Sequence, residues 1–322
     1  MDESVAPPVP IEEDAHHAQA AVSAPVRARI RADAGGQVRA RESRSGRRRA
    51  RRPRAGARRR QFTVNLARGL ETLRAFTPTD FLLGNSELCQ RTSLPKATIS
   101  RLTYTLTQMG YLVRVDRLQK YRLGPEVLML GYPMLAGLEV RHIARPHMEA
   151  LVRATSCTVN LGMLGRLEVV YIDALRLDRG NILQPDIGSA RLLLTTSIGR
   201  ALLLASPAAE CTSILNRLRV ANPSRFAEEK GFLAGDEERF RAEGFCLARG
   251  DFNSDIHAVA APVRAGPRDH PLLALNCTRS TLGRQGGLRT GTMERKVAPR
   301  LLQAVCDIER AYAVMFNPNG KC

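Results

Sequence analysis

The chain has 322 residues, of which 44% are hydrophobic, so it can bury one very large core or, more readily, the cores of two domains. The formal net charge of +18 indicates a polyanionic partner, because clustered Lys and Arg displace the counterions that condense on a nucleic-acid backbone. Charge alone does not choose between DNA, RNA and an anionic membrane. Membrane insertion and export are not expected, since no apolar run reaches roughly 18 residues and the acidic start lacks an apolar signal core.

The seven cysteines are an odd number and form no C-x-x-C pair, so they predict neither a metal knuckle nor a small disulfide framework. A cytoplasmic protein with reduced thiols is the natural interpretation. The sequence contains no G-x-S-x-G, H-E-x-x-H, Walker A or G-x-G-x-x-G motif. His142 and His147 are spaced five residues apart and do not share a helix face as a metal pair would. Neither an enzyme nor a bound metal or cofactor is therefore predicted.

Residues 1–61 are predicted to form a disordered, arginine-rich arm. Their Val and Ile residues follow no period, so the segment cannot offset the entropy of ordering by apolar burial. Residues 39–60 contain 12 Arg and one acidic residue, Glu42, a composition that suits contacts with phosphates or with a minor groove. A tail without an assigned task is an equally good interpretation.

A winged helix-turn-helix is predicted over residues 62–124. Its first helix is indicated by apolar residues at near-helical spacing, and it ends before Pro78, because a residue that precedes proline is disfavoured in the helical region. The apolar residues of this helix are Val64, Leu66, Leu70, Leu73 and Phe76.

The second and third helices of this domain are separated by a tight turn. Asn85 is a good N-cap for a short helix over residues 86–91. Pro95 suits the first turn of the next helix, because its missing N–H is unpaired there in any case, and Gly110 ends that helix after about Gln108. By 3.6-residue geometry the third helix turns one apolar stripe to the core, formed by Ile99, Leu102, Leu106 and Met109.

Two short β-prone runs follow, residues 111–115 and 120–123, and they predict a hairpin that serves as the wing. The outward stripe of the third helix and the hairpin loop carry the predicted DNA contacts. These are Lys96, Ala97, Thr98, Ser100, Arg101, Tyr104, Arg117 and Lys120. Arg101 suits a bidentate contact with a guanine edge, Ser100 a base or a phosphate, and Lys96 a phosphate.

An ordinary three-helix packing unit with solvated charges would explain any one of these features. The combination of cap, turn, proline at the helix start, polar outer stripe and basic hairpin favours DNA binding.

A linker helix is predicted over residues 125–138, and an α+β domain over residues 139–318. A helix is expected first in that domain, followed by strands, mixed helices and further strands. The expected helices are 139–155, 197–205, 237–243 and 293–315, and the expected strands are 158–163, 167–173, 257–263 and 272–278. The whole chain is therefore expected to be a two-domain α+β protein.

Several ordered motifs resemble the IclR-type family of transcriptional regulators over roughly residues 62–318. In the first domain they are Leu66 to Glu71, Leu94 to Leu102, Gly110 to Leu112 and Tyr121 to Pro125. In the second they are Val140 to Pro146, Val169 to Asp173, Gly199 to Leu203 and Ala260 to Val263. The resemblance implies a winged-helix N-terminal domain and a GAF-like α/β C-terminal domain that binds a small effector. It also implies homodimers or homotetramers on palindromic operators near catabolic genes, with small organic or aromatic acids as frequent effectors.

The resemblance places the effector pocket at the loop that enters the Gly199 helix and at a strand with polar residues. A carboxylate there needs donors without competing negative charge, such as hydroxyls, an amide or a backbone N–H at a helix start. The predicted effector-binding residues are Thr196, Ser197, Ile198, His257, Asn276 and Thr278. Taken one at a time, such hydroxyls are also ordinary helix caps and β-forming residues, and a single His is more often structural.

The sequence departs from the family pattern around this pocket. Leu192 and Leu194 stand where the family often has Pro and His, and Ala248 stands where it often has an acid. Asp255 and His257 replace a usual Gly and a basic or polar residue. The identity of the effector therefore does not follow from the resemblance.

These patterns predict a DNA-binding regulator, a repressor or an activator, of a catabolic operon controlled by a small organic or aromatic acid. One alternative is an RNA-binding protein that uses residues 39–60. Another is a small-molecule sensor without DNA binding.

Overall fold

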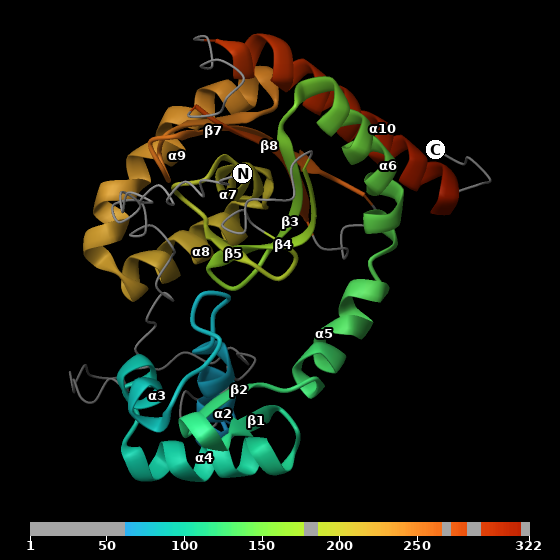
Figure 1. Cartoon of the computed structure of the whole chain (residues 1–322). Coiled ribbons are helices and arrows are strands. Elements are labelled where there is room, and N and C mark those ends of the chain that lie inside the picture. The colour runs from blue at the N-terminus through green and yellow to red at the C-terminus, as the bar shows by residue number, and fades with distance from the viewer. Residues whose placement is uncertain (1–61, 177–185, 266–271, 282–290, 317–322) are drawn as a thin grey trace, which may run out of the picture. The chain divides into compact units, whose positions relative to one another are not determined.

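The structure is a computed structural model that describes residues 62–176, 186–265, 272–281 and 291–316. The predicted arm over residues 1–61 lies outside the described residues. The described chain divides into two compact units, which meet in the sequence between Leu138 and Glu139 (Figure 1). Each unit is described by itself, and the two-domain α+β prediction is confirmed.

The first unit is a winged helix-turn-helix followed by one further helix. Its elements are α2 (Val64–Arg74), α3 (Asn85–Thr92), α4 (Lys96–Gln108), β1 (Leu112–Val115), η1 (Asp116–Leu118), β2 (Lys120–Leu123) and α5 (Glu126–Ala136). Strands β1 and β2 are antiparallel and form the two-stranded wing. The buried core of this unit is small and lies among α2, α3, α4 and β1. It contains Ala75, Phe76, Leu83, Leu88, Ile99, Leu106 and Leu112.

The turn between α3 and α4 follows from local chemistry. At the start of α3, the Gly84 N–H donates to Glu87 Oε2 over 2.6 Å, which satisfies one of the unpaired donors of the helix end. Ser93 adopts a left-handed conformation with φ of 59°, and Pro95 then stands in the N-cap position of α4. The two helices are thus separated by a short, sharply defined turn.

Three details differ from the sequence predictions. Gly84 occupies the N-cap position of α3, and Asn85 is the first helical residue, because Asn85 turns its side chain toward Ser100 and Thr103 on α4. Pro95 precedes α4 and is not part of its first turn. Met109, at the helix end, is exposed, while Thr103, six residues earlier, is buried.

The apolar face predicted for the first helix is also only partly buried. Phe76 packs in the core, but Val64, Leu66 and Leu70 remain exposed. The amphipathic pattern of α2 therefore marks a face that the described chain does not cover.

The second unit is one antiparallel sheet with helices on both faces. Its elements are α6 (Glu139–Thr155), β3 (Thr158–Leu164), β4 (Glu168–Leu175), β5 (Ala190–Leu192), α7 (Ser197–Ala205), α8 (Ala208–Ala221), α9 (Pro223–Glu243), β6 (Cys246–Arg249), β7 (Ile256–Val263), β8 (Leu273–Ser280), η2 (Met293–Val297) and α10 (Ala298–Phe316). The strand order is β5-β4-β3-β8-β7-β6. Helices α6 and α10 cover one face, and α7 packs on the other beside α8 and α9 (Figure 1).

The expected helices and strands of this unit are present, with additions. The predicted helix over residues 237–243 is the end of the much longer α9, and α8 was not predicted. The short strands β5 and β6, which form the two edges of the sheet, were not predicted either. Strands of three or four residues give too few positions for a period to emerge.

The first turn of α7 lies directly against the backbone that precedes it. A Cβ added to Gly199 would come within 2.3 Å of the Leu193 carbonyl oxygen and 2.5 Å of its Cα. Only a residue without a side chain allows this approach. Gly199 therefore fixes where α7 begins relative to β5.

Gly199→Ala is expected to lower the free energy of unfolding by about 1–3 kcal/mol, because backbone atoms cannot move aside as a side chain can. Gly235→Ala in α9 is the matched control, since no atom lies within 4 Å of the Cβ that it would add. The control should be neutral or stabilise the helix by about 0.5–1 kcal/mol. Thermal unfolding of both variants checks this, and equal melting temperatures would contradict it.

Candidate DNA-binding and effector sites

Helix α4 presents a polar, positively charged face outside the core of the first unit. Ile99 and Leu106 are buried and hold the helix on α3 and β1, and this leaves the opposite side facing outward. The exposed residues on that side are Lys96, Ala97, Ser100, Arg101 and Tyr104, and Thr98 is half-buried. Among the described residues, no ion pair is recorded for Lys96 or Arg101, so both cations are available to a partner.

Hydrogen bonds from α3 hold this face in place. Asn85 Nδ2 donates to Ser100 Oγ over 3.4 Å, and Thr103 Oγ1 lies 3.4 Å from Asn85 Oδ1. Thr103 Oγ1 also bonds the carbonyl of Ile99 over 2.9 Å, so this buried hydroxyl is satisfied within its own helix. Ser100 is thus held by α3, while Arg101 beside it is not.

Of the two wing residues predicted to contact DNA, Lys120 is paired, and Arg117 has no ion pair among the described residues. Arg117 is exposed in the loop between β1 and β2. Lys120 Nζ lies 2.8 Å from Glu87 Oε1 and ties the wing to the start of α3. The backbone N–H of Gly84, and then Lys120, lower the pKa of Glu87, since both stabilise its carboxylate. Lys120 therefore has a structural partner inside the unit, in contrast to Arg117.

In the second unit, a row of polar side chains crosses the sheet on the face that α7 covers. Asn160 of β3 and Asn276 of β8 are direct cross-strand partners, and Asn160 Nδ2 donates to Asn276 Oδ1 over 2.9 Å. The Tyr171 hydroxyl of β4 is hydrogen bonded to the Asn276 side chain. Burial raises the pKa of Tyr171, so the phenol is neutral at physiological pH.

Gly162 makes room for the Tyr171 ring. The two residues are cross-strand partners, and a Cβ on Gly162 would come within 3.2 Å of Tyr171 Cδ1 and 2.9 Å of Ile198 Cδ1. A glycine on β3 therefore lets the ring of Tyr171 lie between the sheet and the first turn of α7.

Three buried oxygens at this junction have no hydrogen-bond partner in the described structure: Thr195 Oγ1, Ser197 Oγ and Asn160 Oδ1. Buried polar groups without a partner are uncommon, and these three lie on β3 and at the start of α7, two elements that pack against each other. Thr196 beside them is used differently, because its Oγ1 accepts from the Gly199 N–H over 3.2 Å as the N-cap of α7.

The predicted effector residues therefore do not all come together. Ser197, Ile198 and Asn276 lie at the α7 side of the sheet, and Thr278 lies two residues along β8, where its hydroxyl is 3.5 Å from the Thr158 carbonyl. His257 does not join them. It pairs across strands with Arg249 and Arg279, and Arg249 contacts Glu294 of η2, which lies on the other face of the sheet.

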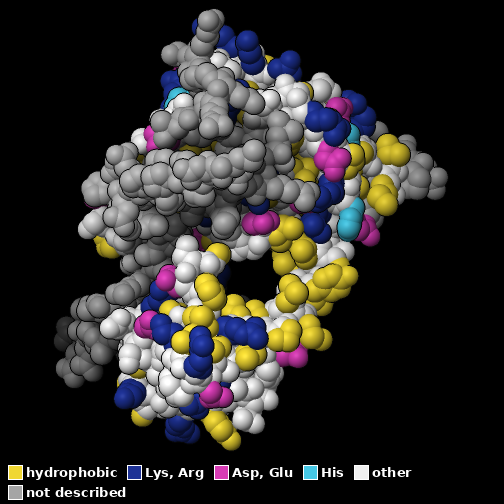
Figure 2. Space-filling model, in the orientation of Figure 1, with side chains coloured by type: hydrophobic (Ala, Val, Ile, Leu, Met, Phe, Trp, Pro, Cys, Tyr) yellow, Lys and Arg dark blue, Asp and Glu magenta, His cyan; other side chains and the backbone are white. Residues whose placement is uncertain are grey.

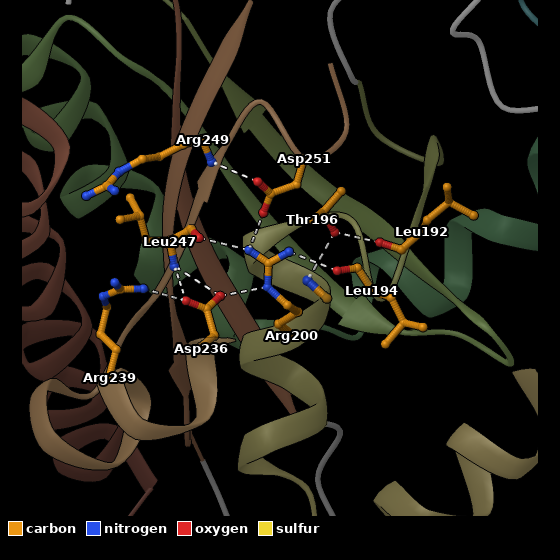
Figure 3. Close-up of polar contacts among 10 residues, drawn as sticks. Leu192, Leu194, Thr196, Arg200, Asp236, Arg239, Leu247, Arg249 and Asp251 are labelled. Carbon is orange, nitrogen blue, oxygen red and sulfur yellow. Dashed lines mark hydrogen bonds and ion pairs between the residues drawn. The ribbon is translucent and has the colours of Figure 1, made fainter. Parts of the chain in front are cut away.

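Behind the start of α7 lies a buried ion network around Arg200 (Figure 3). The Arg200 side chain is 1% exposed and donates to Asp236 Oδ2 over 2.6 Å and to Asp251 Oδ2 over 2.8 Å. It also bonds the carbonyls of Leu194 and Leu247 over 2.8 and 2.9 Å. Asp236 accepts in turn from the Leu247 N–H and from Arg239. One guanidinium on α7 thus contacts α9, β6, the loop after β6 and the segment before α7.

The sequence predictions placed Thr195 in the loop that lines the pocket, but they did not include Asn160, Tyr171 or the Arg200 network. Polar residues inside apolar strands, as at Asn160 and Asn276, were a usable indication for the first of these. Nothing local marks Arg200 as buried, because its partners lie 36 and 51 residues away. Among the described residues there is no group of three or more His, Cys, Asp or Glu placed to hold a metal, and no helix long and apolar enough to cross a membrane.

Comparison with known proteins gives matches to both units. The model of the IclR helix-turn-helix domain matches residues 65–116, and that of the bacterial transcriptional regulator IclR C-terminal region matches residues 133–283. The chain is 31% identical over 247 residues to the HTH-type transcriptional regulator TsaQ1/TsaQ2 of Comamonas testosteroni, covering 76% of this chain and 87% of that protein.

Solved structures agree. An IclR family transcriptional regulator from Brucella abortus superimposes with a TM-score of 0.69 at 37% identity, covering 78% of this chain and 93% of that one. An IclR homolog from Microbacterium hydrocarbonoxydans, crystallised with 4-hydroxybenzoate, has a TM-score of 0.56 at 22% identity, covering 78% and 99%. The second likeness concerns the fold alone.

A DNA-binding winged helix followed in the same chain by an α/β effector-binding domain defines a two-domain transcriptional regulator. More narrowly, the chain belongs to the IclR family of bacterial transcriptional regulators.

Asp236→Ala is expected to lower the free energy of unfolding by about 3–5 kcal/mol, because it leaves the buried Arg200 without its closest counter-charge. The neighbouring Glu237 forms an exposed pair with Arg241, so Glu237→Ala should cost no more than about 1 kcal/mol. Urea unfolding of the two variants measures the difference. Similar midpoints would mean that the buried network contributes no more than a surface ion pair.

Proposed function

We propose that this protein reads a promoter through the outward face of α4 and that a small organic acid, bound between α7 and the sheet, controls that binding. The observation that carries the proposal is the exposed stripe with Lys96 and Arg101, both without an ion pair among the described residues, on a helix fixed by Ile99 and Leu106. A cytoplasmic regulator of a catabolic operon, without enzymatic activity, fits the family.

The contacts divide by chemistry. Arg101 offers a planar pair of donors that matches a guanine edge, and Ser100 offers a hydroxyl whose position α3 fixes. Lys96 at the start of α4 and Arg117 on the wing suit phosphates, which set the register of the protein on the duplex. Lys120 would have to leave Glu87 to reach a phosphate, so we assign it the weakest contribution.

Arg101→Ala is expected to cost about 1–3 kcal/mol at particular base pairs of the operator, because a bidentate contact discriminates between bases. Footprinting and quantitative binding on the DNA that flanks the gene measure this, with Arg219→Ala on the exposed side of α8 as the control. Equal weakening on every sequence would mean that Arg101 contacts phosphate only. Binding that survives Arg101→Ala but requires residues 39–60 would favour the RNA-binding alternative.

The effector site of this proposal is the junction of α7 with the sheet. Ser197 Oγ, Thr195 Oγ1 and Asn160 Oδ1 are buried there without partners, and Ile198 and Val169 supply apolar walls. Such a combination of apolar walls and a few convergent polar groups is typical of small-molecule sites. We propose a small aromatic acid as the class of effector, the class to which the ligand of the IclR homolog crystallised with 4-hydroxybenzoate belongs.

We further propose that the protein is a homo-oligomer built on the apolar faces of α2 and α5. In α2, Val64, Leu66 and Leu70 are exposed, and no residue of α5 is buried although Glu126 is its only charged residue. Figure 2 shows hydrophobic side chains gathered along α5. Exposed apolar patches of this kind mark association surfaces, and a two-fold dimer matches a palindromic operator.

Leu128→Glu in α5 is expected to raise the dimer dissociation constant at least about tenfold, because a charge would be buried in an apolar interface. Leu128 is 75% exposed in the single chain, and Val220 on α8 is 80% exposed, so Val220→Glu is a matched control. Sedimentation equilibrium compares them. Dissociation in both variants or in neither would show that α5 is not the interface.

A further inference from the structure

Arg191 occupies a position on β5 at one end of the polar row. It is the cross-strand partner of Val169 on β4, and partners in antiparallel strands project on the same face of the sheet. Val169 packs in the core cluster with Ile198 and other residues of α7. The Arg191 side chain therefore leaves the sheet on the side of α7, where Tyr171 and the two asparagines lie.

The charge of Arg191 has no carboxylate partner within the described residues. Its Nη1 donates to the Ala190 carbonyl over 2.8 Å, and its guanidinium lies 5.7 Å from the centre of the Phe252 ring. Arg200 differs in this respect, because it forms ion pairs with Asp236 and Asp251. A half-buried guanidinium that stacks on an aromatic ring and keeps donors free is suited to a planar anion.

The positive charge of Arg191 also reaches Tyr171. It opposes the effect of burial on the pKa of the Tyr171 hydroxyl, and the two residues stand on neighbouring strands, on the same face of the sheet. In strand order, this face of the sheet carries a cation on β5, a phenol on β4 and amides on β3 and β8. One end of the row suits a carboxylate, and the other suits an uncharged polar group.

We propose that Arg191 anchors the carboxylate of the effector, while Tyr171 and the Asn160–Asn276 pair recognise an uncharged polar substituent at its other end. This inference rests on the effector site proposed above and names its ligand class, a planar aromatic monoacid that carries a hydroxyl or similar group. Asn160 Oδ1, buried without a partner, is the acceptor for that hydroxyl. Ile198 lies against Gly162 between the two asparagines' strands and α7, and Phe252 stacks with Arg191, so both ends of the row carry apolar surface that suits a flat ring.

The experiment compares an acid with its neutral amide on the full-length protein. Titration calorimetry with 4-hydroxybenzoate and with 4-hydroxybenzamide measures how much affinity depends on the negative charge. We expect the wild type to prefer the acid at least about tenfold and Arg191→Met to lose about 10- to 100-fold in affinity for the acid, with little change for the amide. Arg191→Lys should retain part of the preference, because the charge remains but the planar fork is lost.

Arg166→Met, an exposed arginine in the turn between β3 and β4, is the charge-matched control and should leave both affinities unchanged. Melting temperatures establish that each variant is folded. Unchanged acid binding in Arg191→Met, together with loss in Asn276→Ala, would overturn the role of Arg191 and leave the effector site standing.

Acid binding that neither substitution alters would overturn the effector site itself. A wild type that binds neither probe at millimolar concentration would overturn the aromatic-acid class. Promoter binding that still depends on Arg101 would then leave the regulator function intact.

Discussion

The second unit depends on the burial of one cation, Arg200, between Asp236 and Asp251. Removing a guanidinium from water is costly, and the cost is offset only because four hydrogen bonds, two of them to carboxylates, surround it. Those four partners come from α9, from β6, from the loop after β6 and from the segment before α7. Satisfying one side chain therefore fixes where α7 starts. Thr195 and Ser197 lie at this start, so the position proposed for the effector site depends on the burial of Arg200.

The distance along the chain between interacting residues explains which features the sequence could predict. The helix-turn-helix and its wing depend on residues close together in the chain, such as Pro95 and Gly110, whose backbone preferences act locally. The pocket depends on partners far apart: Asn160 and Asn276 are 116 residues apart, and Arg200 and Asp251 are 51 apart. No periodicity or capping rule encodes such pairings. Of the effector residues predicted from the family resemblance, Ser197 and Asn276 lie on the α7 side of the sheet, whereas strand alternation turns His257 toward the opposite face.

Amphipathic patterns are a second case in which local sequence determines only part of the structure. The spacing of Val64, Leu66 and Leu70 correctly indicates a helix with an apolar face, yet that face is exposed in the described chain. Periodicity predicts that a helix has an apolar face, but it does not predict which surface covers that face. The same holds for α5, which is apolar along its length and buried nowhere. Both faces lie in the unit that contains the DNA-binding helix, where a second copy would set the spacing between two recognition helices.

Strand β4 contacts both the proposed effector site and α6, the helix that follows α5 in the chain. Its pairing with β3 shifts register between Gly162, opposite Tyr171, and Leu161, opposite Asp173, so Ile172 is an extra residue. Without this bulge, Tyr171 and Asp173 would project on the same face. With it, Tyr171 packs under α7, and Asp173 reaches α6, where it pairs with Arg141 and Arg145 over 3.3 and 3.2 Å. The bulge thus lets one strand contribute both to the polar row under α7 and to the ion pairs that hold α6, the helix that follows α5 after only two residues.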